Sequence, residues 1–556
     1  MSNKEIAGQF SLLSKLMDIH GESGFKSKIY SIASYKISQL TVDLQTLSFE
    51  KISQINGIGD AIAKKIIEII STGKMKNLEE LIIQTPAGIF EMLKIKGLGP
   101  KKISVIWKEM GIENIGELLY ACNENRLLLY PGFGKKTQEN VIESIEFYLS
   151  QQGSYLYAQV ELLATELLVY FKKLFSNEEI KITGDFVRQV ETVDVLEYVI
   201  ALPSKIISDK LDSLQEFEQI EKQDQSISYQ YNQGIRIKIY CTSNDDLIKT
   251  TFETTGAPEF VSEFLNHFKE LNFKEAQTEE DIFKMANIQY VPAFLRESKY
   301  MLKVAEQFKI PEVIQAKDIK GIIHCHSKWS DGINSIEELA NACIKSGKEY
   351  LVISDHSKSA NYANGLTEER LKEQHALIDV LNKKLAPFKI YKSIESDILN
   401  DGSLDYSHNV LSTFDLVIGS VHSNLKMSQE KATARLLKAI ENPFTTILGH
   451  MTGRLLLSRK GFPVNDKKII DACAANNVVI EINAHPRRLD MRWQWIDYAL
   501  SRNVLLSIDP DAHSIGEFEN IKYGVFVAQK AMVTPRNNLS SFSRDEFEKF
   551  IVRRRK

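Results

Sequence analysis

The chain has few cysteines, no long apolar run and no recognisable leader. Its 556 residues include five cysteines, at positions 122, 241, 325, 343 and 473, without a CxxC pair or a regular spacing. We therefore expect reduced thiols and a cytoplasmic protein. No apolar run approaches the roughly 18 residues of a membrane span, and MSNKEIAGQF does not look like a signal peptide. We expect neither membrane insertion nor secretion.

An excess of positive charge is also missing. The net charge is -4, and residues 1–150 carry 18 lysines and arginines against 17 aspartates and glutamates. This balance argues against a protein that binds nucleic acid through a broad positive surface. Any DNA binding must therefore use a few local contacts of complementary shape. The composition, 43% hydrophobic and 26% charged, is that of an ordinary globular protein, and the length predicts three or four domains.

The C-terminal part of the chain contains histidines that lie close in sequence to aspartates and glutamates. Nine of the eleven histidines lie in the last 233 residues, most of them in short strings that follow apolar runs such as LVIS, DLVIGSV and VLLSI. Such runs predict buried strands that deliver polar groups to one rim of a barrel. The candidate metal ligands are His324, His326, Asp331, His356, Glu395, His422, His450, Asp511 and His513.

These nine groups exceed what a single ion can bind. Imidazole and carboxylate together suit divalent zinc, manganese or iron. Two or three such ions can clamp a phosphate and activate water, which predicts a metal-dependent phosphoesterase in which Glu395 could bridge two ions. For any one of these positions alone, a structural histidine, capped or packed in the core, would be the better interpretation. That interpretation does not suit the whole set.

The same strings resemble the polymerase and histidinol phosphatase (PHP) domain family, whose pattern runs HxHTxxSDG, TDHS, GxExDI, GSxH, GHP and DAH. The resemblance implies a seven-stranded distorted barrel and up to three ions. It assigns His324, His326, Glu395 and Asp511 to one ion, Glu395, His422 and His450 to a second, and Asp331, His356 and His513 to a third.

Two details of the PHP resemblance concern residues around the ligands. The family's aspartate two residues before the first histidine is Ile322 here, which implies a looser orientation of that histidine and not an empty site. EINAHPRRLD resembles the family's EINxxPxRLD, which makes Arg488 and Arg454 candidates for binding substrate phosphate. A structural ion pair is equally open for both.

Glycine turns recur three times in the first 150 residues, in QINGIGDAIAKKIIEI, KIKGLGPKKISVIW and LYPGFGKKTQENVI. Paired glycines permit a tight turn that points backbone N–H groups at a helix start, where a phosphate is favoured. The turns resemble the helix-hairpin-helix motif of DNA repair proteins, which holds the sugar-phosphate backbone without reading sequence. The candidate DNA-binding residues are Gly57, Gly59, Lys65, Gly97, Gly99, Lys101, Lys102, Gly132, Gly134, Lys135 and Lys136.

With the hairpins and the metal strings at opposite ends, the whole chain resembles a bacterial family X DNA polymerase that carries a PHP domain. KITGDFVRQVETVDVLEYVIALP falls where these polymerases have GSxRRxxETxxDxDxL. Ungapped alignment places Val195 and Glu197 at the positions of two metal-binding aspartates and Lys238 at that of the third. Asp185 replaces a phosphate-binding serine, although Arg188 remains.

These replacements predict a degenerate, inactive polymerase site. A shifted alignment could use Asp194 as a ligand, but Asp194 and Glu197 would face opposite sides of a strand unless a bulge intervened. Lys65 takes the position of the Schiff-base lysine of the family's lyase domains; a solvated surface lysine is the better-supported reading.

The expected fold is multidomain. It combines an all-α helix-hairpin-helix N-terminal region, an α+β nucleotidyltransferase-like palm and thumb, and a C-terminal α/β distorted (β/α)7 PHP barrel. The expected boundaries are 1–82 for a lyase-like helical domain, 83–150 for further, fingers-like hairpins, 151–305 for palm and thumb, 306–316 for a linker and 317–556 for the PHP domain.

The expected function is DNA repair through phosphodiester hydrolysis, as a 3′-5′ exonuclease or an AP endonuclease. Its partner would be gapped, abasic or 3′-ended DNA, bound mainly through the backbone. The expected catalytic residues are Glu395, His422, His450, Arg454 and Arg488. Magnesium would matter only if the polymerase site were active. An active gap-filling polymerase with PHP proofreading stays open, as does a histidinol-phosphate type phosphatase, which would leave the hairpins without a purpose.

Overall fold

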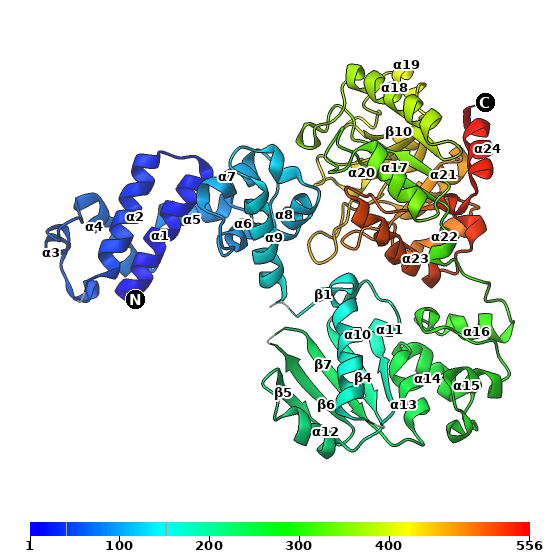
Figure 1. Ribbon diagram of the computed structural model, residues 1–556. Helices are drawn as coiled ribbons and strands as arrows, with labels where there is room; N and C mark the ends of the chain where they lie inside the picture. The colour runs from blue at the N-terminus through cyan, green and yellow to red at the C-terminus, as the bar shows by residue number, and fades with distance from the viewer. Residues whose placement is uncertain (41, 151–152, 177, 233, 556) are drawn as a thin grey trace. The chain divides into compact units, whose positions relative to one another are not determined.

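A computed structural model describes residues 1–40, 42–150, 153–176, 178–232 and 234–555 (Figure 1). The chain forms two compact units. Unit 1 comprises residues 1–123 and 130–146, and unit 2 comprises residues 124–129 and 147–556. The boundary expected at residues 150–151 adjoins 151–152, which lie outside the described residues. No helix within the described ranges is long and apolar enough to cross a membrane.

Unit 1 is helical. Its first helix begins at a capping box, in which Ser2 and Glu5 satisfy each other's backbone N–H groups, and it ends at Gly21 with φ 74°. The helices are α1 (Asn3–His20), α2 (Gly24–Ser38), α3 (Phe49–Ser53), α4 (Asp60–Thr72), α5 (Lys76–Gln84), α6 (Ala87–Met92), α7 (Pro100–Lys108), α8 (Ile115–Asn123) and α9 (Lys135–Ser150), whose last turn lies beyond residue 146.

The three glycine turns share one backbone geometry. The first glycine of each turn, Gly57, Gly97 and Gly132, has a φ of 91°, 90° and 88° respectively. A residue with a Cβ atom is strained at these angles, which explains glycine at all three positions. The second glycine caps the start of α4 and α7, and in the third turn it directly precedes α9.

The palm of unit 2 is a mixed sheet of five strands in the order β2-β4-β7-β6-β5. Helix α10 (Tyr157–Leu174) covers one face, where Phe171 packs edge-on against Tyr198 at 5.0 Å and the Tyr198 hydroxyl donates to the Ala164 carbonyl. The strands are β2 (Ile180–Thr183), β4 (Val195–Ile200), β5 (Phe217–Lys222), β6 (Ser226–Tyr231) and β7 (Arg236–Cys241); β1 (Tyr155–Leu156) pairs with β3 (Thr192–Val193).

Short helices form a thumb after the palm. They pack around a phenylalanine cluster in which the Phe252 and Phe264 rings lie 4.7 Å apart. The remaining helices up to residue 306 are α11 (Gly184–Val187), α12 (Ser204–Leu211), α13 (Leu247–Thr255), α14 (Pro258–His267), α15 (Glu279–Met285) and α16 (Tyr300–Glu306). Residues 307–315 form neither helix nor strand, where the linker was expected.

Seven parallel strands in sequential order, β8 to β14, form a nearly closed barrel. Cys325 and Ala512 make a parallel bridge between its first and last edges. Most strands are buried along their whole length, as parallel strands covered on both faces are. The strands are β8 (Gly321–Cys325), β9 (Tyr350–Ile353), β10 (Lys389–Asp397), β11 (Leu416–Ser420), β12 (Thr445–Leu448), β13 (Val479–Asn483) and β14 (Leu506–Asp509).

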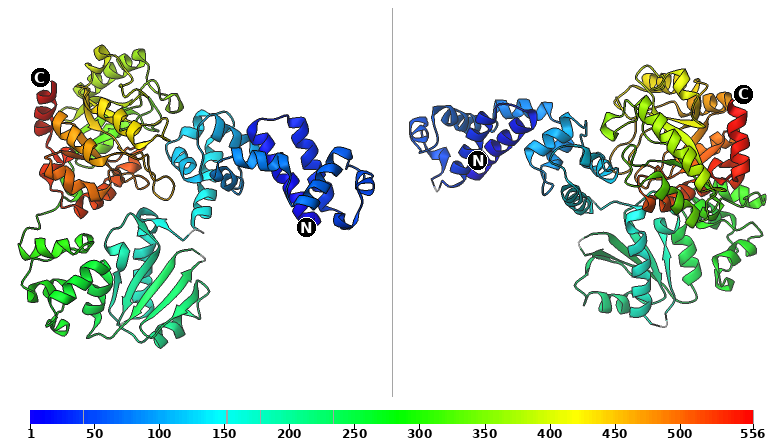
Figure 2. Two further views of the ribbon diagram at one scale, coloured as in Figure 1. Left: turned by 180° about the vertical axis from the view of Figure 1, so that it is seen from behind. Right: turned by 45° about the horizontal axis from the view of Figure 1, so that its top comes forward.

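Helices surround the barrel strands in both views of Figure 2. They are α17 (Ile336–Lys345), α18 (Glu368–Lys384), α19 (His408–Leu411), α20 (Gln429–Ile440), α21 (Asp466–Asn476), α22 (Ile496–Ser501), α23 (Ile521–Lys530) and α24 (Arg544–Arg555). The expected fold class is confirmed. Helix α23 also contacts the palm, where Glu161 accepts hydrogen bonds from Lys522 Nζ at 2.6 Å and the Tyr523 hydroxyl at 2.8 Å.

Candidate metal centre

The nine candidate ligands lie at or just beyond the carboxyl ends of the barrel strands. Loops at this rim of a β/α barrel converge on one point, which is why such rims carry active sites. Glu395 lies within β10 and His324 within β8, and each of the other seven follows a barrel strand by one to six residues. His324 and Asp511 have left-handed backbone angles, with φ of 57° and 51°. His324 also lies in a bulge of β8, a device that re-aims a side chain.

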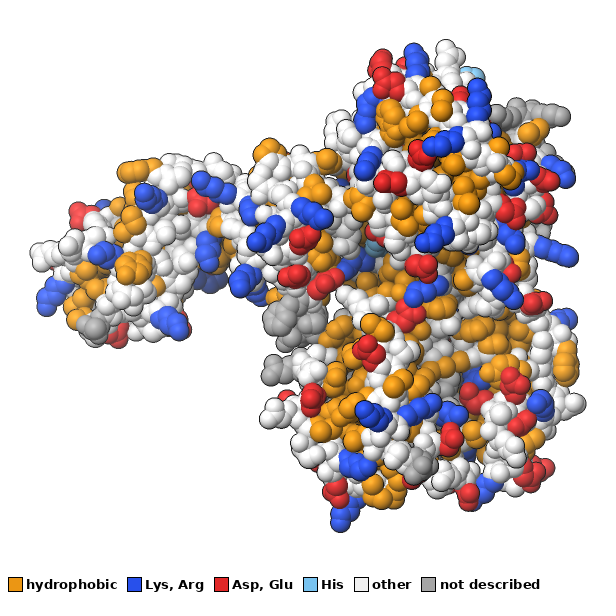
Figure 3. Space-filling view, in the orientation of Figure 1, with side chains coloured by type: hydrophobic (Ala, Val, Ile, Leu, Met, Phe, Trp, Pro, Cys, Tyr) orange, Lys and Arg blue, Asp and Glu red, His pale blue; other side chains and the backbone are white. Residues whose placement is uncertain are grey.

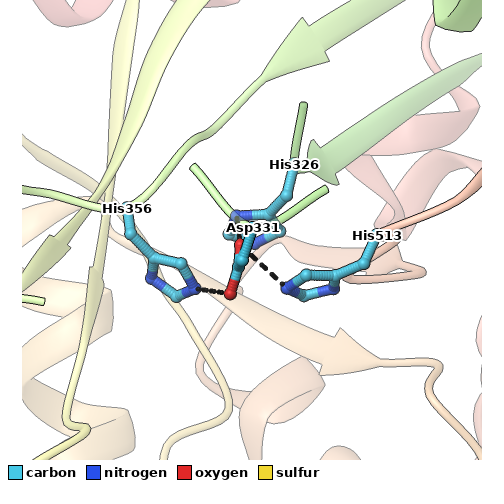
Figure 4. Close-up of side chains that lie close together, drawn as sticks. All are labelled: His326, Asp331, His356 and His513. Carbon is cyan, nitrogen blue, oxygen red and sulfur yellow. Dashed lines mark ion pairs between the residues drawn. The ribbon is translucent and has the colours of Figure 1, made fainter. Parts of the chain in front are cut away.

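One cluster is centred on Asp331, which lies between two histidines (Figure 4). Asp331 Oδ2 is 3.4 Å from His356 Nε2, and Asp331 Oδ1 is 3.4 Å from His513 Nε2. His326 Nδ1 is 3.8 Å from Asp331 Oδ1. The structure therefore adds His326 to the trio that the resemblance assigned to one ion.

A second cluster joins the first histidine pair to Asp511. Asp511 Oδ1 lies 3.1 Å from His326 Nε2 and 3.4 Å from His324 Nε2. All three side chains are buried. His326 thus borders both clusters, with one ring nitrogen toward each.

Glu395 lies at the centre of the constellation. Its Oε1 is 3.0 Å from His450 Nε2, 3.1 Å from His422 Nε2 and 3.3 Å from His324 Nε2. Its Oε2 is 2.9 Å from His356 Nδ1. A carboxylate in contact with four histidines can bridge ions. His356 therefore lies beside Glu395 and His422 as well as Asp331, whereas the resemblance assigned it to one ion only.

Two further carboxylates, Asp397 and Glu481, orient ligand histidines, and a third, Asp355, holds the loop ahead of Asp331; none of them was predicted as a ligand. His422 Nδ1 lies 2.6 Å from Asp397 Oδ1, and His324 Nδ1 contacts Glu481. Asp355 accepts from the Ser327 backbone N–H and hydroxyl, both at 2.7 Å. Such partners fix the ring orientation of metal-binding histidines. Ile322, which replaces the family's aspartate, is an apolar core residue and cannot orient His324. The carboxylate of Glu481 contacts His324 instead.

Signals for two of these residues were present in the sequence. Asp397 follows Glu395 by two positions on β10, so both side chains point to the same face. Glu481 is the first residue of the quoted EINAHPRRLD string.

The surroundings of Glu395 and Asp511 favour the ionised form of these two carboxylates. Burial alone would raise the pKa of Glu395, but the neighbouring His422, His324 and His356 hold it well below its usual range. Burial acts in the same way on Asp511, whose pKa is held well below its usual range by His324 and His326. Glu395 and Asp511 therefore offer anionic oxygen atoms as ligands to a cation.

The histidine pKa values move in both directions. Burial and the neighbouring His513 and His356 lower the pKa of His326 to about 3. Burial alone would lower the pKa of His513 as well, but Asp331 and Glu124 raise it to about 10. Protons and metal ions compete for the same nitrogens, so metal affinity should fall with falling pH.

The donor set fits divalent ions. Within the described residues, several of its buried atoms make no hydrogen bond: His324 Nε2, His326 Nδ1, Asp331 Oδ2, Glu395 Oε2 and His513 Nε2. Unsatisfied buried polar atoms are rare in folded proteins. Two ligands about 2.1 Å from one ion lie about 3 to 3.5 Å apart, and the atom pairs above are separated by 2.9 to 3.8 Å.

Both candidate phosphate-binding arginines are buried. Arg488 Nε is 3.6 Å from Asp511 Oδ2, which places it beside the metal centre. Arg454 instead forms a two-point ion pair with Glu191 of the palm, with its two terminal nitrogens 2.6 and 3.2 Å from the carboxylate oxygens. The structural pairing that the sequence left open for Arg454 is thus present.

The palm retains one carboxylate at the aligned metal positions. β4 and β7 are parallel, and Glu197 pairs directly with Lys238 in their register. Glu197 Oε1 accepts from the Tyr240 hydroxyl at 2.8 Å, and burial raises its pKa. Val195 begins the strand, and Asp194 is exposed and accepts from the Ser154 hydroxyl at 2.5 Å.

The phosphate side of the palm is internally paired. Arg188 forms an ion pair with Asp185, its Nε is 3.5 Å from Glu297, and it donates to the Thr255 carbonyl at 3.0 Å. A triphosphate would have to displace both carboxylates to reach this guanidinium.

The hairpin lysines lie on the surface of unit 1. Lys101, Lys135 and Lys136 are exposed, and Lys102 is half-buried with its Nζ 5.8 Å from the Phe133 ring. Lys65 is half-buried and donates to Asn77 Oδ1 at 2.8 Å. On the face shown in Figure 3, basic side chains of unit 1 are spread out and not gathered in one patch.

Family models match three parts of the chain. A Helix-hairpin-helix domain matches residues 1–75, a SAM-like Helix-hairpin-helix tandem matches residues 89–146, and a PHP domain matches residues 323–485. The DNA polymerase/3'-5' exonuclease PolX of Bacillus subtilis is 31% identical over 573 aligned residues, which cover 100% of both chains.

Shorter relatives are named as phosphatases. A probable phosphatase of Clostridium novyi is 27% identical over 154 residues, 25% of this chain and 61% of the relative. A probable phosphatase of Thermoanaerobacter pseudethanolicus is 27% identical over 165 residues, 29% of this chain and 62% of the relative.

Proposed function

Because the chain belongs to the family X DNA polymerases that carry a C-terminal PHP domain, we propose that it is a DNA-repair nuclease whose palm does not polymerise. The PHP domain makes it a metal-dependent phosphoesterase. Its substrate is DNA that is gapped, abasic or 3′-ended, and hydrolysis proceeds from a 3′ end or beside an abasic site. The convergence of the nine candidate ligands, with Glu395 at their centre, is the observation that carries this proposal.

Each group at the rim has a role in the proposed hydrolysis. The clustered histidines and carboxylates would hold divalent manganese, zinc or iron, which would supply neutralisation of phosphate charge and activation of water. Glu395 holds the four surrounding histidines around a common centre and stays ionised. Asp397 fixes the ring of His422 at Nδ1, so that Nε2 points to Glu395. Arg488, beside Asp511, binds a phosphate oxygen, and the buried rim limits access of other solutes.

The palm is proposed to bind or position DNA without nucleotidyl transfer. Two magnesium ions need several carboxylates, and Glu197 has Lys238 as its direct neighbour. The hairpins of unit 1 hold the DNA backbone through their glycine turns and through Lys65, Lys101, Lys102, Lys135 and Lys136. Lys65 is a binding residue in this proposal and not a nucleophile, because its ammonium group donates to Asn77 Oδ1.

The deciding experiment follows the length of a labelled strand. Duplexes with a gap or a 3′ overhang, labelled at the 5′ end, are incubated with purified protein, dNTPs and either Mn²⁺ or Mg²⁺, and the products are sized on a denaturing gel. We expect stepwise shortening. Template-dependent lengthening that disappears in Glu197→Gln would instead establish an active polymerase and refute the proposal for the palm.

A second substrate separates the two hydrolytic modes. An AP endonuclease cuts an internally labelled duplex once, at the abasic site, whereas a 3′-5′ exonuclease gives a ladder from the end. The named phosphatase relatives favour one competing activity, hydrolysis of small phosphomonoesters. Turnover of p-nitrophenyl phosphate with no shortening of DNA would favour that activity.

A further inference from the structure

A short segment ahead of the third hairpin lies against the metal centre. Residues 124–129 belong to unit 2, and the turn η2 (Arg126–Leu129) contacts η6 (Asn361–Ala363) of the PHP barrel. Glu124 is 3% exposed, and the side chain of Arg126 is 16% exposed. Buried charges are costly unless they are paired. This segment therefore brings two charged side chains to Asp331 and Tyr362, which lie more than 200 positions away in sequence.

Arg126 lies between an aromatic ring and a metal-ligand candidate. Its guanidinium carbon is 4.5 Å from the centre of the Tyr362 ring, and its Nε is 3.9 Å from Asp331 Oδ2. The Tyr362 ring is 6.1 Å from the His356 ring and 6.3 Å from the His422 ring. The guanidinium is thus adjacent to two of the ligand clusters.

The guanidinium of Arg126 pairs with the carboxylate of Glu124, which comes from the same segment and not from the barrel. An arginine fork is planar and permanently charged, and it donates two parallel hydrogen bonds to a carboxylate or a phosphate. Stacking on an aromatic ring fixes the plane of such a fork. Glu124 therefore presents to Arg126 the kind of anionic oxygen that a substrate phosphate would present.

We propose that Arg126 is a phosphate-binding residue of the hydrolytic site, and that Glu124 is the internal anion displaced by the phosphate of a DNA substrate. The inference rests on the proposed nuclease function and extends it to a side chain outside the PHP domain. The N-terminal third of the chain then contributes directly to substrate binding at the C-terminal site.

Kinetics of the full chain test the role of Arg126. In Arg126→Ala we expect KM for 3′-overhang DNA to rise about tenfold with kcat changed less than about threefold, because one charge-assisted phosphate contact is lost. Arg126→Lys should recover part of the loss. Glu124→Gln should lower KM, because the competing charge is gone. Arg502→Ala, an exposed arginine paired with Asp471, is the matched control and should leave both constants unchanged.

A double variant guards against misfolding. Arg126→Ala leaves Glu124 buried without this partner, which could destabilise the fold. The double variant Arg126→Ala/Glu124→Gln removes both charges. It should show the same rise in KM as Arg126→Ala and the melting temperature of the wild type. Unchanged KM in the double variant would overturn the proposal and leave a structural ion pair. A higher kcat in both Arg126→Ala and Glu124→Gln would also overturn it, because the segment would then be a plug.

A binding measurement separates this inference from the proposed function. Two proteins are titrated into a fluorescent tetranucleotide, the single variant His422→Ala and the double variant His422→Ala/Arg126→Ala. Fluorescence anisotropy reports their affinities. We expect about tenfold weaker binding when Arg126 is absent. If this difference appears while the wild-type chain never cleaves DNA, the nuclease proposal fails and the phosphate site stands. Equal affinities would reject the phosphate site whether or not DNA is cleaved.

Discussion

The palm and the barrel each bury a glutamate, and the two glutamates have opposite pKa shifts. In the palm, burial raises the pKa of Glu197, whose partner is the Tyr240 hydroxyl. In the barrel, burial acts in the same direction on Glu395, but His422, His324 and His356 overcome it and hold the pKa well below its usual range. The surroundings of Glu395 favour its charged form, which a cation needs, whereas those of Glu197 disfavour it.

The palm has a well-packed apolar core beside the positions that align with the family's metal ligands. Leu196, Tyr198 and Ile200 still form a buried face of β4 against α10, so the sheet keeps its core. The aligned metal positions between them carry Val195, Glu197 and, on β7, Lys238. The stability of a sheet depends on its apolar face, whereas catalysis depends on a few polar positions. Catalysis can therefore be lost while the sheet stays folded.

The largest expected effect is the loss of the barrel's central carboxylate. Glu395→Gln keeps the shape but removes the charge shared by four histidines, and we expect DNA cleavage to fall by at least about 10³-fold. DNA affinity, measured separately by anisotropy, should stay within about twofold. His408→Ala, an exposed histidine outside the cluster, is the control. If Glu395→Gln cleaved DNA at the wild-type rate, the charge of Glu395 would not be needed for cleavage. The contrast between Glu395 in the barrel and Glu197 in the palm would then be wrong.

A smaller effect is expected from the carboxylates behind the ligands. Asp397→Asn and Glu481→Gln release the rings of His422 and His324, and partners of this kind typically contribute 10- to 100-fold in metal affinity, roughly. Cleavage should therefore be restored at higher Mn²⁺ concentration. A Mn²⁺ titration of the cleavage rate checks this, since Glu395→Gln should not recover. Failure of both variants to recover would place Asp397 and Glu481 in the reaction itself.

The contact between palm and barrel can be tested at Arg454 and Glu191. Arg454→Ala leaves a largely buried carboxylate unpaired, and we expect a loss of about 3 kcal/mol in the free energy of unfolding. The double variant with Glu191→Gln should lose less than the sum of the two single variants. Urea denaturation gives the three values. Additive losses, together with a raised KM for DNA, would instead make Arg454 a phosphate-binding residue.

The smallest expected effect is the pH dependence of the palm glutamate. Because the folded-state pKa of Glu197 is raised, its contribution to stability is complete at low pH and is lost as pH rises through the folded pKa. Glu197→Gln should therefore melt roughly 2 °C higher than the wild type near pH 7 and equally near pH 4. Thermal unfolding at the two pH values checks this. A lower melting temperature of the variant at neutral pH would mean that Glu197 binds a cation in the palm.

Much of the architecture was predictable because it repeats or is periodic. The three glycine turns predicted three hairpins, and the matching φ angles of Gly57, Gly97 and Gly132 follow from the one residue type that tolerates them. Apolar runs followed by histidine and carboxylate predicted strands with ligands at one rim. The family resemblance, which supplied the number of barrel strands, is confirmed by the full-length relative and by the PHP match.

The details of the centre depended on which loops meet. His356 lies beside both Asp331 and Glu395, and His326 borders two clusters, because the loops after neighbouring strands converge at the rim. Family spacing assigned each of these histidines to a single ion. The pairing of Arg454 with Glu191 was equally beyond the sequence, since 263 positions separate them.

The sequence by itself determined the domain types and the chemistry of the candidate ligands, because these depend on residue type and on spacing within one element. The tertiary structure alone decided how the ligands are shared, which carboxylates orient them, and that Arg126 and Glu124 lie at a centre built by residues more than 200 positions away. Long-range contacts are set by how whole elements pack, and local sequence patterns carry no record of them.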